Sequence, residues 1–240
     1  MTDNIDIHRL IDRPIEHLDA TQRRWLKPLG IVAGGLRAIL FGINRLVMRM
    51  LFGTRAIGLE HLPDGTFLLC PNHTSSLDPA AILSLIDYRT ARQLRWAGRR
   101  GAVLTNPFRR FANRLAGTIP LDRDLSALAV GAAALREGYS LGWFPEGTRT
   151  TTGEMQEFKP GVGMLMATLG TPAVPVYIHG AFEAWPPTRK LPRKLCRIEV
   201  RFGPPLLPRD FVQDEWDEQT AIDKLTEELR RRVKELGDRG

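Results

Sequence analysis

The chain has 240 residues, of which 43% are hydrophobic and 25% charged. This is enough for one sizeable core, so we expect a single globular domain with short terminal extensions. The formal charge of +7 favours an anionic partner such as nucleic acid, lipid head groups or a phosphorylated small molecule. The two cysteines, Cys70 and Cys196, are too few for a disulfide framework and lack the spacing of a zinc site, so we expect both to be reduced.

The N-terminal quarter predicts a membrane-surface element. The first ten residues lack the apolar run of a secretory signal peptide, so we expect the chain to stay inside the cell. Residues 28–53 read as a basic amphipathic helix, since apolar residues recur at helical spacing and Arg37, Arg45 and Arg49 project from another side. Such a helix can lie in the head-group layer with its arginines on lipid phosphates, or pack on the core with a solvated arginine face. The three arginines argue against a membrane-spanning helix.

Short apolar runs alternate with helical stretches from about residue 55, which is typical of an α/β fold with a mixed, largely parallel sheet. The domain boundary is expected between a helical segment, 1–54, and an α/β domain, 55–240. Strands are expected at 66–71, 95–98, 118–122, 140–144, 173–180 and 197–203. Helices are expected after Asp78, with Asp78 as N-cap and Pro79 in the first turn, and at 106–117, 126–138, 161–170 and 218–236. Pro120 suggests an edge strand.

Ligand sites of α/β folds gather outside the carboxyl ends of strands, and the turn PNHTSSLDP at 71–79 lies at such a point. Its His73 can act as a general base near neutral pH. The carboxylate of Asp78, five residues on, can fold back to accept the other ring proton and hold the tautomer. A lone histidine at a strand end is more often structural, so this turn does not establish catalysis by itself.

Cations follow two other predicted strands. Glu146 and Arg149 flank Gly147 and Thr148 in FPEGTRT, and Lys159 follows shortly after. Arg123 ends GTIPLDR after the strand at 118–122. A base together with strand-end cations describes a site that holds and deprotonates a phosphate-bearing alcohol.

Other chemistries lack their motifs. The sequence has no G-x-S-x-G elbow, so direct transfer without a covalent enzyme intermediate is expected. It has no G-x-x-x-x-G-K-[ST] loop and no His/Cys cluster, which argues against nucleotide hydrolysis and a bound metal. The basic residues are spread along the chain without a nucleic-acid-binding motif, so no nucleic-acid partner is expected.

Four ordered blocks resemble the lysophospholipid acyltransferase family, best known for the 1-acylglycerol-3-phosphate acyltransferases: NHTSSLD, GTIPLDR, FPEGTRT and VPVYI. The resemblance implies His73 as catalytic base with Asp78 as its partner. It also implies Arg123, Glu146, Gly147 and Arg149 as the acceptor-binding residues, to which we add Lys159. Pro120 and Leu121 stand where many members of the family have an aromatic residue and an Ile before Asp-Arg.

The implied reaction moves a fatty-acyl group from acyl-CoA or acyl-carrier protein to a lysophospholipid, without a cofactor. The implied location is the cytoplasmic face of an anionic membrane, with peripheral or monotopic attachment. Backbone N–H groups after Asp78 or at Gly147 are the two candidates for stabilising the oxyanion. Other lysolipid acceptors and a non-catalytic lipid-binding protein stay open as alternatives.

Overall fold

The computed structural model describes residues 7–122, 126–189, 191–193 and 196–238. Its centre is a seven-stranded sheet in the order β1-β7-β6-β2-β5-β3-β4, parallel throughout except for the β6–β7 pair. The strands are β1 (Arg55–Ile57), β2 (Leu68–Pro71), β3 (Leu94–Arg99), β4 (Thr118–Leu121), β5 (Ser140–Gly142), β6 (Ala173–His179) and β7 (Glu199–Phe202). The predicted mixed, largely parallel α/β fold is therefore confirmed.

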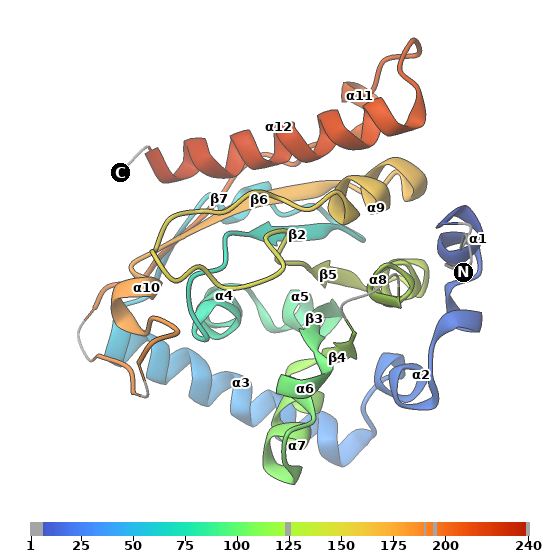
Figure 1. Cartoon of the computed structure of the whole chain (residues 1–240). Coiled ribbons are helices and arrows are strands. Elements are labelled where there is room, and N and C mark those ends of the chain that lie inside the picture. The colour runs from blue at the N-terminus through green and yellow to red at the C-terminus, as the bar shows by residue number, and fades with distance from the viewer. Residues whose placement is uncertain (1–6, 123–125, 190, 194–195, 239–240) are drawn as a thin grey trace.

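Helices cover both faces of the sheet (Figure 1). One layer contains α8 (Ser126–Arg136), α9 (Gly161–Leu169) and α12 (Glu218–Asp238), and the other contains α3 (Ile31–Phe52), α4 (Asp78–Leu85) and α5 (Tyr88–Gln93). The central strand β2 shows why two layers form. Its Leu68 belongs to the first core and Leu69 to the second, because successive strand residues point to opposite faces.

Most predicted elements are present with small shifts in their ends. Helix α7 (Pro107–Ala116) ends at Gly117 as expected, and β4, which contains Pro120, is an edge strand. The predicted apolar stripe of α12 is buried: Ile222, Leu225, Leu229, Val233 and Leu236. After α3, the elements not predicted are short: β1, α5, α6 (Arg100–Val103), α10 (Ala181–Ala184), α11 (Pro208–Phe211) and the 3-10 helix η2 (Leu59–His61).

The N-terminal segment contains more than the one predicted helix. Three elements precede α3: helix α1 (Ile7–Asp12), the 3-10 helix η1 (Pro14–His17) and helix α2 (Ala20–Leu26). All three contact α8, and α2 also contacts β4. Helix α2 begins with a capping box, in which Asp19 accepts from the Gln22 N–H at 2.8 Å and Gln22 accepts from the Asp19 N–H at 3.0 Å. The boundary at residues 54 and 55 stays a prediction.

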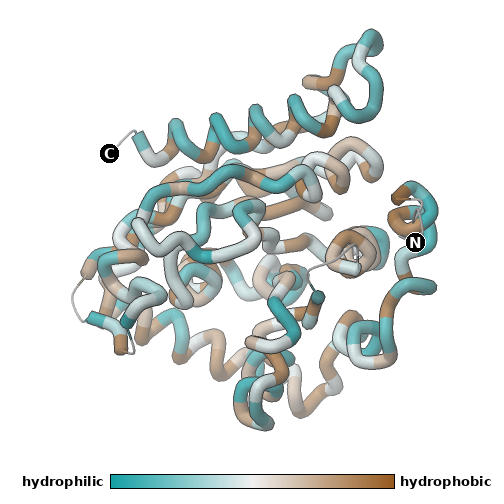
Figure 2. Tube along the Cα trace, in the orientation of Figure 1, coloured by the Kyte–Doolittle hydropathy of each residue, from teal (hydrophilic) through white to brown (hydrophobic). Residues whose placement is uncertain are grey.

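Helix α3 turns its apolar side outward. Ile39, Leu40, Ile43, Val47, Met50 and Leu51 are all exposed, although they belong to the predicted apolar face. The opposite side rests on α4, where Met48 and Phe52 are buried. Figure 2 shows the hydrophobic colouring along this outer helix. Of the two alternatives for residues 28–53, packing of the apolar face on the core is therefore wrong.

The prediction that Arg37 projects toward lipid is also wrong. Its side chain is buried and donates to the Ala91 carbonyl at 2.6 Å. This carbonyl lies in the last turn of α5, where carbonyls lack partners within the helix and often accept from an arginine. Arg45 and Arg49 are exposed as expected. By length and composition alone, α3 could cross a membrane.

The close packing of Gly142 in β5 against the Trp96 ring predicts that a larger residue there lowers stability. A Cβ on Gly142 would lie 2.4 Å from the Trp96 ring, so Gly142→Ala should lower the free energy of unfolding by about 1–3 kcal/mol in urea denaturation. Gly35→Ala is the control, since no atom lies within 4 Å of its added Cβ and alanine favours a helix. Equal effects of the two changes would contradict the proposed overpacking.

Candidate active site

Two loops meet at the carboxyl edge of the sheet. Strands β2 and β5 are parallel neighbours, so the loops that follow them leave the sheet side by side. The Thr150 N–H donates to the His73 carbonyl at 2.9 Å, and the His73 N–H donates to Glu146 Oε1 at 2.7 Å. The sequence-based expectation that these two turns come together is met by this geometry.

His73 and Asp78 are paired within the first loop. The His73 Nδ1 lies 2.8 Å from Asp78 Oδ2, and the histidine side chain is 19% exposed whereas Asp78 is fully buried. An ionised carboxylate can only accept here, so the proton belongs on Nδ1 and Nε2 presents its lone pair. Within the described part of the chain no residue forms a hydrogen bond with Nε2, which leaves that nitrogen available to a substrate proton.

Asp78 is not the N-cap that the sequence suggested. Helix α4 begins at Asp78 itself, and Leu77 occupies the cap position. The carboxylate turns back over the loop, where Oδ2 also accepts from the N–H groups of Thr74 at 2.8 Å and Ser75 at 2.9 Å. The Asp78 carboxylate therefore accepts from N–H groups of the loop instead of the helix. These hydrogen bonds hold the backbone of residues 73–75 around the His73 ring.

An aromatic stack supports the His73 ring, and sequence reasoning missed it. The rings of His73 and Phe144 lie 3.8 Å apart between centroids at an interplanar angle of 22°. Phe144 in turn stacks on Trp96 at 5.6 Å and 23°. The available signal was the position of Phe144 at the end of the predicted strand 140–144, since ligand sites of α/β folds gather where strands end.

Glu146 connects the two loops from a buried position. It is 3% exposed, and its Oε2 accepts from the Gln156 N–H at 3.0 Å and from Gln156 Nε2 at 3.2 Å. Burial raises the pKa of Glu146, against the opposing effect of the bonds from Gln156 and the His73 backbone. Both oxygens are thus occupied by protein donors, and direct contact between Glu146 and a substrate stays a prediction. Gln156 was not anticipated.

The exposed cations lie beside this pair of loops. Arg149 is exposed and its Nη1 donates to Ser76 Oγ, which joins the second loop to the first. Lys159 is exposed and its N–H donates to the Pro145 carbonyl at 2.9 Å. Its side chain crosses Gly147, whose φ of +74° suits glycine and whose added Cβ would lie 3.0 Å from Lys159 Nζ.

One candidate oxyanion donor is already engaged. The Gly147 N–H donates to the Phe144 carbonyl at 3.0 Å, so it would have to leave this turn before binding an oxyanion. At the other candidate position, Pro79 has no N–H and the Ala81 N–H donates to the Leu77 carbonyl at 2.8 Å.

Arg123 lies outside the described residues. Its neighbour Asp122 pairs with Arg100 at 3.0 Å.

Two nucleophilic side chains near His73, those of Ser75 and Cys70, are buried. Ser75 Oγ donates to the Trp185 carbonyl at 2.7 Å and accepts from the Leu77 N–H at 3.1 Å. Cys70 is buried in β2, and burial raises the pKa of its thiol, which disfavours the reactive thiolate. Direct transfer without a covalent enzyme intermediate stays a prediction. Within the described ranges, no group of three or more His, Cys, Asp or Glu side chains could hold a metal ion.

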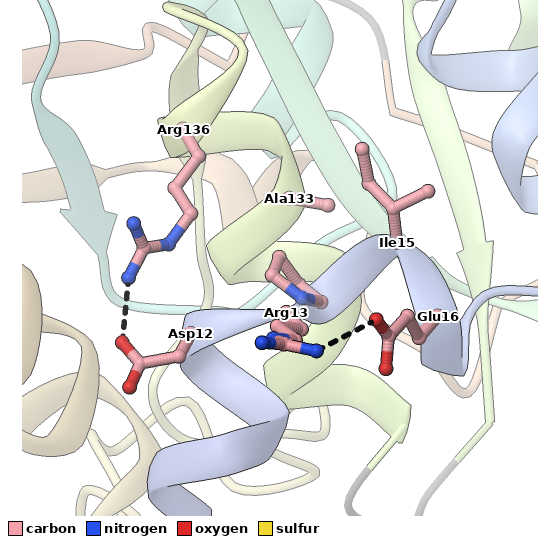
Figure 3. Close-up of a pocket in the computed structure, with 7 residues that line it drawn as sticks. Asp12, Arg13, Ile15, Glu16, Ala133 and Arg136 are labelled. Carbon is pink, nitrogen blue, oxygen red and sulfur yellow. Dashed lines mark hydrogen bonds and ion pairs between the residues drawn. The ribbon is translucent and has the colours of Figure 1, made fainter.

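A separate hollow of about 230 Å³ lies between η1 and α8 (Figure 3). Arg136 pairs with Asp12 at 2.9 Å along its wall, and Arg13 pairs with Glu16 at 3.6 Å. None of its lining residues belongs to the His73 site. We assign it no part in the chemistry.

The Glu146 contacts yield a second prediction. Glu146→Ala leaves the partly buried N–H groups of His73 and Gln156 unpaired, so the free energy of unfolding should fall by about 1–3 kcal/mol. Because the pKa is raised in the folded state, this loss should be largest below pH 4.5 and shrink as pH rises through the folded pKa. Urea denaturation across pH measures it.

Glu157→Ala is the matched control, since Glu157 is exposed and forms a surface ion pair with Arg230 at 2.8 Å. A surface pair of this kind contributes about 0–1 kcal/mol. A Glu146 effect no larger than the Glu157 effect would show that the loop connection is not needed for folding.

Comparison with known proteins places this site in a family. Over 136 residues the chain is 30% identical to the chloroplastic 1-acyl-sn-glycerol-3-phosphate acyltransferase BAT2 of Brassica napus, covering 54% of this chain and 38% of that protein. Over 180 residues it is 27% identical to 1-acyl-sn-glycerol-3-phosphate acyltransferase alpha of Mus musculus, covering 70% and 60%. The matches thus span less than two thirds of these relatives.

The crystal structure of the 1-acyl-sn-glycerophosphate (LPA) acyltransferase PlsC from Thermotoga maritima has the same fold. It superposes with a TM-score of 0.65 at 22% sequence identity, covering 84% of this chain and 81% of that one. Residues 54–179 match the Acyltransferase family, and this range includes the two loops that meet at His73. The chain belongs to the Acyltransferase family.

Proposed function

We propose that this protein transfers a fatty-acyl group from acyl-CoA or acyl-carrier protein to the hydroxyl of a lysophospholipid at a membrane surface. The acceptor that we favour is 1-acylglycerol-3-phosphate, which gives phosphatidic acid. One observation carries the proposal: the 2.8 Å contact between His73 Nδ1 and the buried Asp78 carboxylate, with Nε2 directed away from it. The names of the relatives support the choice of acceptor.

The reaction needs one base and no covalent enzyme intermediate. His73 Nε2 takes the proton of the acceptor hydroxyl as its oxygen attacks the thioester carbonyl carbon. The new C–O bond forms, and the tetrahedral intermediate then expels the thiolate. The imidazolium, which Asp78 stabilises through Nδ1–H, returns the proton to that sulfur. The products are the ester and the free thiol.

The acceptor phosphate would bind to exposed cations beside His73. Arg149 is suited to this role because a guanidinium can grip phosphate with two parallel hydrogen bonds. Lys159 supplies a second charge near Gly147. Arg123 is proposed here from the family resemblance alone.

Attachment to the membrane would use the outer face of α3. Its exposed apolar residues would enter the boundary between head groups and acyl chains, while Arg45 and Arg49 contact lipid phosphates. The inner face holds the helix on the domain, since Asn44 Nδ2 donates to the Ala80 carbonyl at 2.9 Å. These contacts favour a helix lying on the membrane surface over one crossing the bilayer, and the face that we propose is the cytoplasmic one.

A product analysis tests the proposed reaction. Purified protein is incubated with mixed acyl-CoA or acyl-carrier-protein donors and a panel of lysolipids, and the products are identified by mass spectrometry. Phosphatidic acid from 1-acylglycerol-3-phosphate is the expected major product. Acylation of another lysolipid would replace the acceptor, and no product with any pair would favour a non-catalytic lipid-binding protein.

Substitution of the His73 pair should abolish most turnover. We expect His73→Ala to lower kcat by about 10²–10⁴, the usual contribution of a general base. Asp78→Asn should also lose most activity, because an amide can hold the ring in the wrong tautomer. Steady-state kinetics and a circular dichroism melt of each variant provide the measurement. Full activity in a folded His73→Ala protein would refute the assignment.

Arg149→Ala should act mainly on the acceptor. Loss of a charge-assisted contact should raise its apparent KM by about tenfold or more, with little change in the donor KM. Arg209→Ala is a control, since Arg209 is exposed and pairs with Asp210 within α11. A rise in the donor KM instead would assign Arg149 to the phosphates of coenzyme A.

A further inference from the structure

Helix α7 carries an apolar stripe that runs out of the core into solvent. Phe108, Phe111 and Leu115 share one side of the helix, because they lie three, four and seven positions apart. Their exposed fractions are 80% for Phe108, 52% for Phe111 and 4% for Leu115. The domain thus covers the last turn of the stripe and leaves two phenylalanines uncovered.

The exposed turns are well defined. Asn106 caps α7 by accepting from the Arg109 N–H at 2.8 Å, and Pro107 follows in the first turn. The phenyl rings are therefore presented on a stable helix end. Two neighbouring exposed phenylalanines on such a helix are typical of an interaction surface.

Arg114 joins α7 to the start of α3. Its guanidinium donates to the carbonyls of Trp25 and Lys27, both at 2.7 Å, and of Arg24 at 3.1 Å. These carbonyls lie at the end of α2, just before α3, and α3 also contacts α7 directly. Ile31 and Val32, in the first turn of α3, are 97% and 87% exposed. Helices α3 and α7 therefore form one block on the same side of the molecule (Figure 1).

The positive charge of this block indicates an anionic partner. The segments 20–59 and 88–121, which contain α2, α3 and α7, have no Asp or Glu. Arg109 and Arg110 are exposed beside the two phenylalanines, as are Arg24 and Lys27 across the Arg114 contact. Apolar side chains surrounded by cations complement an anionic lipid bilayer, where rings enter the interface and cations meet phosphates.

We infer that α7 is a second membrane-contact helix, which inserts Phe108 and Phe111 into an anionic bilayer beside α3. Contact along α3 alone would allow the domain to roll about the helix axis. A second contact away from that axis removes this freedom and fixes the angle at which the His73 edge meets the lipid surface. The inference rests on the proposed membrane-surface function.

Vesicle partitioning of the full chain tests the inference. The vesicles are phosphatidylcholine alone or phosphatidylcholine with 30% phosphatidylglycerol, a composition chosen as a roughly physiological anionic surface. Phe108→Ser/Phe111→Ser should lower the partition coefficient at least about tenfold on both. Arg109→Glu/Arg110→Glu should lower it mainly on the anionic vesicles. Ile15→Ser is the control, since Ile15 is also exposed but packs beside α8 and should change little.

Two readouts separate this inference from the proposed reaction. Activity on vesicle-embedded acceptor should fall with partitioning in the phenylalanine variant, whereas activity on a monomeric short-chain acceptor should be unchanged. The partition coefficients decide the inference even if no acyl transfer is detected. Partitioning equal to wild type would overturn it, and so would a phenylalanine variant that loses only self-association in analytical ultracentrifugation.

Discussion

The buried carboxylate of Asp78 organises the site more than any other group. A single oxygen, Oδ2, accepts from His73 Nδ1 and from the N–H groups of Thr74 and Ser75. A carboxylate removed from water is costly unless it is paired, so the loop must keep these three donors on it. The same contacts determine the tautomer of His73 and the path of the loop. The ring then has one side available for Phe144 and one nitrogen available for substrate.

The second loop depends on the first through the sheet. Because β2 and β5 are paired in parallel, Phe144 and Glu146 leave the sheet at the level of His73. Phe144 stacks on the ring, and Glu146 binds the backbone N–H of the same residue. His73 is thus held by its side chain, by its ring face and by its main chain. Catalytic groups require this kind of support, since small displacements of a base from its substrate are costly in rate.

Local patterns in the sequence predicted the strands, the main helices and the pairing of His73 with Asp78, because each depends on a few consecutive residues. The contacts of Phe144 and Gln156 could not be predicted in the same way, since they follow from which strands are neighbours. Periodicity likewise identified the apolar face of α3 but not its direction. Tertiary contacts decide whether that face packs on the core or faces outward. The burial of Arg37 shows that in this protein the polar side packs inward. Arg123 lies outside the described residues, so its role rests on resemblance.

Arg37 also explains why an apolar helix of this length would remain on the domain. Burial, followed by repulsion from Arg95, lowers the pKa of Arg37 to about 10. Its charge is nonetheless compensated by the Ala91 carbonyl near the carboxyl end of α5, where the helix dipole favours a cation. Moving α3 into the bilayer core would break that contact and place an arginine in hydrocarbon, at a cost of at least about 2.5–3.5 kcal/mol. A position on the membrane surface keeps the hydrogen bond between Arg37 and Ala91 and still lets Ile39, Ile43 and Met50 contact lipid. The polar inner side and the apolar outer side of α3 therefore favour the same arrangement, with the helix lying flat between the domain and the membrane.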